Sequence, residues 1–415
     1  MAATKAGRVD PAVVVILAGV AAALHVGKLA PAIPLLRAAL DVTLVQAGFL
    51  LSAVQVAGML LGLAFGVVAD GLGGRRSMLL GLGLLSLASL GGGAAPDVAV
   101  LLALRVLEGF GFLLVALPAP GLLRQLVAPG RVNQVLGIWG AYMPLATALA
   151  LLIGPLCMAA LGWRAWWWLL AGVSLAMALW LAQAVPAAVV RPAPPASPSA
   201  NTAADPAWLA RLRQTLAAPG PWLVALAFAA YSSQWLAVIG FLPSIYTQAG
   251  VSGAATGVLT ALAAAVNIVG NVGSGRLLQR GAHAPWLLAT GFGVMALAAA
   301  AAFAQGAGPG GWGLPPALRY AAVLLFSGVG GLIPATLFTL ALRLAPSERT
   351  LSTTVGWVQQ WSSFGQFAGP PAVAWVASVA GGWQFTWVAT GTCSALGLLL
   401  TALLARCVRR VRRGR

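Results

Sequence analysis

Four ionisable side chains lie inside long apolar runs of this sequence. His25 and Lys28 stand three residues apart in ALHVGKLAPAIP, and Arg105 and Glu108 stand three residues apart in RVLEG. Residues at this spacing share one face of a helix. Lysine and arginine bind anions, histidine changes its charge near neutral pH, and a buried glutamate can take up a proton. These types and spacings indicate anion binding, proton transfer or both.

The composition identifies the medium around these charges. The chain of 415 residues is 60% hydrophobic and 7% charged, whereas soluble globular proteins carry about 25% charged residues. Its apolar runs are about 20 residues or longer, which is the length that crosses a lipid bilayer as a helix. We therefore expect an all-α integral membrane protein. Its three cysteines lie within or at the end of apolar segments, so we expect no disulfide framework and no metal site.

We expect twelve membrane spans, at 11–36, 44–69, 77–95, 98–121, 132–159, 165–187, 221–246, 253–277, 284–305, 317–342, 351–378 and 383–407. If the N-terminus is cytoplasmic, 19 of the 24 Lys and Arg residues lie on cytoplasmic segments and 3 on outer loops. This bias is the positive-inside pattern. It places both termini in the cytoplasm and explains the net charge of +17 without a nucleic-acid partner. The arginine-rich C-terminal tail could also contact anionic lipid.

The spans form two groups of six. Between them, VRPAPPASPSANTAADPAW is rich in Pro, Ala and Ser, a composition that is typical of a linker. We predict a six-helix bundle over residues 1–187, a cytoplasmic linker over 188–219 and a second six-helix bundle with a basic tail over 220–415.

The loop GVVADGLGGRR, between the second and third spans, resembles the hallmark loop of the major facilitator superfamily, G-x-x-x-D-R/K-x-G-R/K-R/K. The matching residues are Gly66, Asp70, Gly73, Arg75 and Arg76, whereas Gly71 replaces the usual base. In the second half, the loop NVGSGRLLQR has Arg276 at the position equivalent to Gly71, but it has no acidic residue at the position equivalent to Asp70. Arg105 and Gly109 are similar to the family's R-x-x-x-G motif. Gly140–Pro144 and Gly240–Pro243 resemble cyanate- and nitroimidazole-permease-like members.

The resemblance implies two six-helix bundles that rock around a midplane site. It also implies that spans one and four line the central cavity of the first half. Asp70 would face a helix N-terminus across the interface and, with the loop's arginines and glycines, would stabilise the outward-open state. The competing interpretation is a tight glycine turn with arginines that only set the topology.

Depth estimates place the four ionisable groups near one another. At about 1.5 Å per residue, His25 lies about 20 Å and Lys28 about 24 Å from the inner edge of a core about 30 Å thick. Arg105 and Glu108 lie about 10 and 15 Å below the outer edge. Because Glu108 can neutralise one cation, an anionic substrate would supply the missing partner for the other.

We therefore predict Lys28, Arg105 and His25 as substrate-binding residues, and Glu108 and His25 as the proton-coupling pair. Mid-span polar and aromatic residues complete the predicted substrate site: Tyr142, Tyr231, Gln234, Trp235, Asn267, Gln360 and Trp361. Simpler roles stay open. Lys28 could extend to the outer interface, Arg105 and Glu108 could form a structural pair, His25 could be a packing residue, and the polar residues could join helices.

The leading functional hypothesis is a monomeric secondary transporter of the bacterial cytoplasmic membrane that imports a small organic anion, with protons as the coupling ion and no cofactor. The alternative is a drug/proton antiporter, although its usual acid on span one is replaced here by His and Lys. A nucleotide-binding loop is absent from the sequence. A membrane-embedded enzyme would need more convergent acids, bases or ligands, and a receptor would need a signalling domain.

The gate hypothesis predicts the effect of Asp70→Asn. This variant should reach the membrane in normal amounts but lose most of its transport, because the amide cannot supply the negative charge that the helix N-terminus favours. Transport and surface abundance are measured in parallel. Full transport by Asp70→Asn would exclude the gate role.

Overall fold

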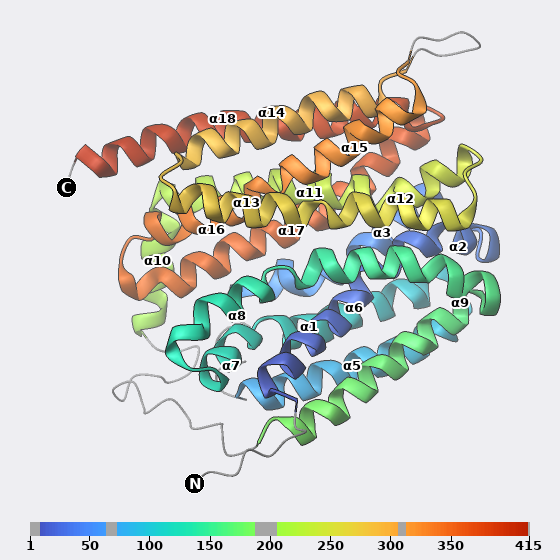
Figure 1. Cartoon of the computed structure of the whole chain (residues 1–415), viewed down its shortest axis with the longest axis horizontal. Helices are drawn as coiled ribbons and strands as arrows, with labels where there is room; N and C mark the ends of the chain where they lie inside the picture. Colours follow the sequence, from blue (N-terminus) through green and yellow to red (C-terminus); the bar gives the residue numbers. More distant parts are fainter. Residues whose placement is uncertain (1–8, 64–72, 187–205, 306–312, 414–415) are drawn as a thin grey trace.

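The computed structural model describes residues 9–63, 73–186, 206–305 and 313–413. Within these ranges the secondary structure consists of helices, turns and bends, with no strand. Two helical bundles lie side by side, the blue-to-green N-terminal one and the yellow-to-red C-terminal one (Figure 1). The start of α1 and the end of α18 lie at the same end of the molecule (Figure 1), which we call the terminal end.

The N-terminal bundle contains long helices and several short ones that interrupt or connect them. Its described elements are α1 (Pro11–Gly27), η1 (Ala30–Ala32), α2 (Ile33–Ala39), α3 (Leu44–Ser52), η2 (Ala53–Gln55), α5 (Gly74–Gly93), α6 (Val98–Ala116), α7 (Ala119–Leu126), η3 (Pro129–Arg131), α8 (Val132–Trp139) and α9 (Tyr142–Ala184).

The C-terminal bundle repeats this pattern of long and interrupted helices. Helix α10 (Pro206–Ala217) precedes this bundle. The described elements that follow are α11 (Pro219–Gln248), α12 (Gly253–Ala265), α13 (Asn267–Gln279), α14 (Ala284–Phe303), α15 (Pro316–Gly330), α16 (Leu332–Leu344), η5 (Glu348–Thr350), α17 (Leu351–Val379), η6 (Trp383–Phe385) and α18 (Thr386–Arg413).

Length and hydropathy agree with a membrane protein. Among the described residues, nine helical stretches are long and apolar enough to cross a bilayer. One of them, α9, has 43 residues and a break at Gly162, where φ is 82°. The all-helical membrane fold expected from composition is thus confirmed, whereas the count of twelve spans stays a prediction.

Two membrane stretches of the N-terminal bundle are broken near their middle. The first is broken between α1 and η1, where Pro31 has no backbone N–H to continue the helix. The second is broken at η2, a single 3₁₀ turn between α3 and the helix that continues to Leu63. A 3₁₀ turn within a long helix often marks a hinge.

The two bundles contact each other along a seam. This seam extends to the side of the molecule opposite the terminal end. Gly48 of α3 packs on the backbone of Pro370 and Pro371 in α17, and Leu51 packs on Gly240 of α11. Farther along, Gln55 donates a hydrogen bond of 3.0 Å to Gln366. One buried apolar cluster runs from Leu29, Ile33 and Leu50 in the first bundle to Val238 and Leu242 in the second. We call α3, η1 and α2, with their partners on α11 and α17, the seal.

Close helix packing predicts the effect of one glycine substitution. A Cβ at Gly109 would collide with the Val54 carbonyl group, whereas a Cβ at Gly83 would meet nothing within 4 Å. Gly109→Ala should therefore cost about 1–3 kcal/mol of stability through overpacking, and Gly83→Ala should cost little. Thermal unfolding in detergent tests this, and equal melting temperatures for the two variants would contradict the packing.

Candidate functional site

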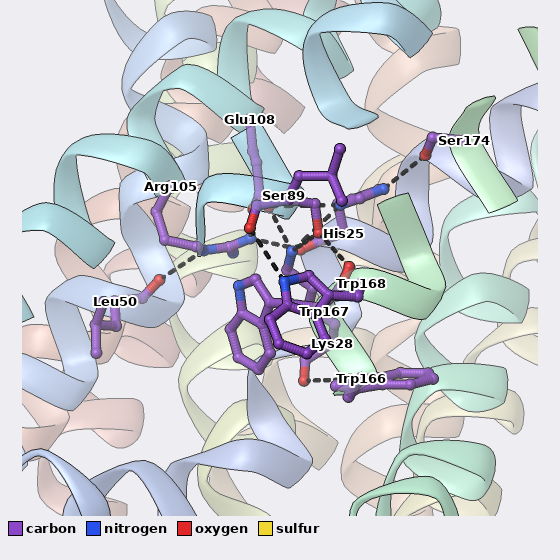
Figure 2. Close-up of polar contacts among 11 residues, drawn as sticks. His25, Lys28, Leu50, Ser89, Arg105, Glu108, Trp166, Trp167, Trp168 and Ser174 are labelled. Atoms are coloured by element: carbon purple, nitrogen blue, oxygen red, sulfur yellow. Dashed lines mark hydrogen bonds and ion pairs between the residues drawn. The ribbon is translucent and has the colours of Figure 1, made fainter. Parts of the chain in front are cut away.

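The side chain of Glu108 is the centre of a buried charge cluster in the N-terminal bundle (Figure 2). Its Oε1 pairs with Lys28 Nζ, and its Oε2 pairs with Arg105 Nη1 at 2.5 Å. His25 Nδ1 lies 3.6 Å from Oε1. All four side chains are 0–1% exposed. One carboxylate of α6 thus joins two cations and a histidine from two helices.

Lys28 uses every donor of its ammonium group. Besides Glu108, it donates to Ser89 Oγ of α5 at 2.9 Å and to His25 Nδ1 at 3.3 Å. Its Nζ also lies 4.8 Å from the ring centroid of Trp167, a distance at which an aromatic face attracts a cation. The Trp166 indole donates to the Lys28 carbonyl oxygen at 3.1 Å. Lys28 therefore lies inside the bundle, and the alternative of an ammonium at the outer interface is wrong.

The hydrogen bonds of His25 define its tautomer. Because Lys28 Nζ has no acceptor atom, it donates to Nδ1, and the ring proton must be on Nε2. Nε2 then donates to Ser174 Oγ of α9 at 2.7 Å. In this neutral form the Nδ1 lone pair lies beside Glu108 Oε1. If a proton bound Nδ1 in place of the Lys28 donor, the resulting imidazolium would form an ion pair with the same carboxylate.

Arg105 binds two backbone carbonyl groups in addition to Glu108. Its Nη1 donates to the His25 carbonyl oxygen at 2.6 Å, and its Nε donates to that of Leu50 at 3.3 Å. Its Nη2 is buried without a hydrogen-bond partner among the described residues. Arg105 thus contacts three separate helices: α1, α3 and its own.

The expected proximity of the four ionisable residues is confirmed. Their side chains contact α5 and α9, so the cluster lies within the N-terminal bundle. Two cations share one carboxylate and His25 is neutral, which leaves a net charge of +1. A group of three or more His, Cys, Asp or Glu residues that could hold a metal does not occur in the described ranges. The substrate-binding and proton-coupling roles stay predictions.

The C-terminal bundle holds an uncharged polar cluster. Asn267 Nδ2 donates to the Tyr231 hydroxyl at 3.1 Å and to the Ser327 carbonyl oxygen at 2.8 Å. Trp235 donates to Ser327 Oγ at 3.1 Å, and Asn271 donates to Asn267 Oδ1 at 2.7 Å. Three residues of the predicted substrate site, Tyr231, Trp235 and Asn267, therefore lie together.

The other predicted substrate residues are spread over the molecule. Gln234 accepts a hydrogen bond from Ser394 of α18 at 2.9 Å. Tyr142 stacks on Trp139 with ring centroids 4.3 Å apart. Gln360 accepts from the backbone of Leu63, across the seam, at 3.3 Å. Gln360 and Trp361 also line a small cavity with Met59, Trp357 and Phe364.

The gate residues are described only in part. Gly66 and Asp70 lie outside the described residues. Gly73 precedes α5 with φ of 79°, a conformation that favours glycine. Arg75 donates to the carbonyl oxygens of Ala182 and Val185 at 2.8 and 2.7 Å. Arg76 and Arg276 are exposed. Arg75 thus ties the start of α5 to the end of α9.

Sequence reasoning missed four residues that complete the charge cluster: Ser89, Trp166, Trp167 and Ser174. A serine or tryptophan in an apolar helix is common, and nothing in the sequence says which helix faces another. The available signal was a serine within a run of small and apolar residues, as at Ser89 in GLLSLASLGG of α5.

A family model matches most of this chain. The model described as Major Facilitator Superfamily matches residues 14–353. The chain belongs to the Major Facilitator Superfamily. Members of this family are transporters, which supports a multi-pass membrane transporter rather than an enzyme. The resemblance seen in the hallmark loop is thereby confirmed.

Curated relatives of this major facilitator match it over short stretches. It is 33% identical over 111 residues to the tetracenomycin C resistance and export protein of Streptomyces glaucescens, which covers 27% of this chain and 21% of that protein. It is 39% identical over 100 residues to a puromycin resistance protein of Streptomyces alboniger, which covers 24% of this chain and 20% of that protein. The matches thus span about a fifth of those relatives.

Solved structures match nearly the whole chain. A bacterial homolog of the human lysosomal transporter Spinster, in an inward-facing and unoccupied conformation, has a TM-score of 0.78 at 17% identity and covers 97% of this chain and 98% of its own. A D-xylose-proton symporter has a TM-score of 0.70 at 16% identity, covering 95% and 96%. At these identities the likeness shows the fold.

The cluster predicts non-additive effects on stability. Glu108→Gln leaves two buried cations without their carboxylate and should cost about 3–5 kcal/mol. Adding Lys28→Met removes one of those cations and should restore part of the loss. A double-mutant cycle on unfolding free energies measures this coupling. Strictly additive costs of the two substitutions would contradict the ion pair.

Proposed function

We propose that this major facilitator is a proton-coupled secondary transporter that exports small amphipathic organic compounds. The observation that supports it most is the closed charge cluster around Glu108. A carboxylate, a neutral histidine and an ammonium group share hydrogen bonds inside one bundle. Such a network can hold one proton in alternative places, and intramembrane ionisable groups of transporters commonly form proton relays.

The topology of the proposal has twelve spans with both termini in the cytoplasm of a bacterium. The break at Gly162 divides α9 into two membrane segments, and α5 and α17, with 20 and 29 residues, are also long enough to cross. The bundles are 1–187 and 220–415, joined by a linker over 188–219. With this orientation the seal lies on the outer side of the membrane.

The substrate class follows from where the charges are. Lys28 and Arg105 are occupied by Glu108, serine and backbone partners and are fully buried. The polar cluster at Tyr231, Trp235 and Asn267 is uncharged, and the cavity beside Gln360 and Trp361 is largely aromatic. These surfaces suit a neutral or aromatic compound better than a carboxylate. The names of two relatives, a resistance and export protein and a resistance protein, agree with export.

Import of a small organic anion is the second candidate. It is favoured by the excess positive charge of the cluster and by the unpartnered Nη2 of Arg105. A carboxylate that reached Arg105 after a rearrangement would supply the missing negative charge.

Everted membrane vesicles separate the candidates. With an acidic lumen, an exporter should accumulate puromycin or tetracenomycin C in exchange for protons, whereas an anion symporter should not. Glu108→Gln should lower this accumulation about tenfold or more, because it cannot release the coupling proton. It should retain gradient-free exchange of labelled compound.

The matched control is Glu348→Gln, since Glu348 is an exposed carboxylate in η5. This variant should transport like the wild type. Proton-driven benzoate uptake in right-side-out vesicles, with no movement of either drug, would favour the anion importer. Wild-type accumulation by Glu108→Gln would exclude Glu108 as the proton carrier.

A further inference from the structure

Helix α10 and its neighbours form a corner at the terminal end of the molecule (Figure 1). Helix α10 packs against η5 and the start of α17. In the first turn of α11, the ideal Cβ position of Gly220 lies 3.0 Å from the Cβ of Leu344, at the end of α16. We call α10, η5, the last turn of α16 and the first two turns of α17 the α10 corner.

The α10 corner has an excess of positive charge. Arg211 and Arg213 lie on α10, Arg343 lies at the end of α16, and Arg349 lies beside Glu348 in η5. Four arginines and one glutamate give the described part of the corner a net charge of +3. No ion pair among the described residues involves any of them. Arginines at this end also follow the positive-inside pattern, so the charge by itself does not make a binding site.

Three tryptophans indicate the depth of α10 in the membrane. Trp222 Nε1 donates to the Leu216 carbonyl oxygen at 2.9 Å, so the first turn of α11 holds the end of α10. The ring of Trp222 lies 4.8 Å from that of Trp357 and 5.7 Å from that of Trp361. Tryptophans concentrate at the headgroup level of a bilayer. Helix α10 is therefore held close to the level of the lipid phosphates.

The exposed face of α10 suits a membrane surface. Leu209 and Arg213 lie one turn apart on this helix, and both are exposed, Leu209 by 56%. A helix at the membrane surface places apolar side chains at the boundary of the acyl chains and basic side chains near anionic headgroups. This pair of residues provides both kinds of contact.

Buried hydrogen-bond donors of the α10 corner have no partner among the described residues. They are the hydroxyl group of Thr215 on α10, the hydroxyl group of Thr354 in the first turn of α17, and Trp357 Nε1 one turn later. Thr215 and Thr354 are 0% exposed. Such groups are rare, because a buried polar atom without a partner is costly. Each of the three can donate to an oxygen of a phosphate.

We propose that the α10 corner binds the phosphate headgroup of an anionic phospholipid from the leaflet at the terminal end. The arginines attract the phosphate. The headgroup enters between α10 and α17, where the hydroxyl groups of Thr215 and Thr354 and the indole N–H of Trp357 donate to its oxygens. A zwitterionic lipid binds less well, because its own cation is repelled by the arginines. The site is separate from the charge cluster around Glu108.

Two variants and a matched control test the site. The double variant Arg211→Gln with Arg213→Gln removes two positive charges from α10. The control, Arg124→Gln with Arg131→Gln, removes two charges from the N-terminal bundle, where both arginines are exposed in α7 and η3. Thr215→Val removes a buried hydroxyl group and keeps the shape of the side chain.

Native mass spectrometry of the full-length protein in detergent counts the bound lipids. The protein is titrated with phosphatidylglycerol, with phosphatidylcholine of the same acyl chains, and with inorganic phosphate. The wild type should bind the first phosphatidylglycerol about tenfold more tightly than phosphatidylcholine, and inorganic phosphate only weakly.

An arginine near an anionic headgroup contributes about fivefold in affinity. The α10 double variant should therefore bind phosphatidylglycerol about tenfold or more weakly, and the control should change by less than about twofold. Thr215→Val should weaken binding about threefold without lowering the melting temperature, because its hydroxyl group has no partner in the protein.

Four results would overturn the proposal. Equal weakening in the two double variants would show binding to surface charge in general, and equal affinity for phosphatidylcholine would exclude selection of an anionic lipid. Inorganic phosphate that bound as tightly as phosphatidylglycerol would assign the corner to a soluble anion. Unchanged affinity in Thr215→Val would show that the headgroup does not reach the buried donors. Lipid binding is measured without transport, so each of these results leaves the proposed function untouched.

Discussion

The carboxylate of Glu108 is the interaction on which the rest of the N-terminal bundle depends. The side chains of Glu108 and of its partners are 0–1% exposed. An unpaired charge at such a buried position would be costly. Lys28 and Arg105 can be buried there only because Glu108 stands between them. The N–H groups of Lys28 and Arg105 that do not bind Glu108 need other hydrogen-bond acceptors. These acceptors are the Ser89 hydroxyl, the His25 ring and two backbone carbonyl groups. Helices α1, α3, α5, α6 and α9 all contribute contacts to this charge cluster.

This arrangement separates two tasks that a transporter must perform. The charged cluster lies within one bundle, and the uncharged cluster of Tyr231, Trp235 and Asn267 lies within the other. The seam between the bundles combines a buried apolar cluster with contacts of glycine, proline and glutamine, such as Gly48 on Pro371 and Gln55 with Gln366. In the proposed function, the charged cluster binds the proton. Substrate then meets mainly neutral and aromatic groups.

The sequence was sufficient for the fold and for the meeting of the four charges. Long apolar runs, the hallmark loop and the spacing of His25, Lys28, Arg105 and Glu108 follow from simple helical geometry. It could not say which way the charges face, because span depth gives height and leaves rotation about the helix axis open. For this reason the sequence predicted a cation without a partner and did not predict the contacts of Lys28 with Ser89 and Trp167. The break at η2 was also invisible, since AVQ has no helix-breaking residue.

The central claim is that Glu108 binds the coupling proton. Infrared difference spectroscopy between alkaline and acidic pH measures this directly, because a protonated carboxylic acid has a C=O stretching band that a carboxylate lacks. The wild type should gain such a band on acidification, it should shift on addition of a transported compound, and it should be missing in Glu108→Gln. An unchanged band in Glu108→Gln would show that another group binds the proton and would contradict the account.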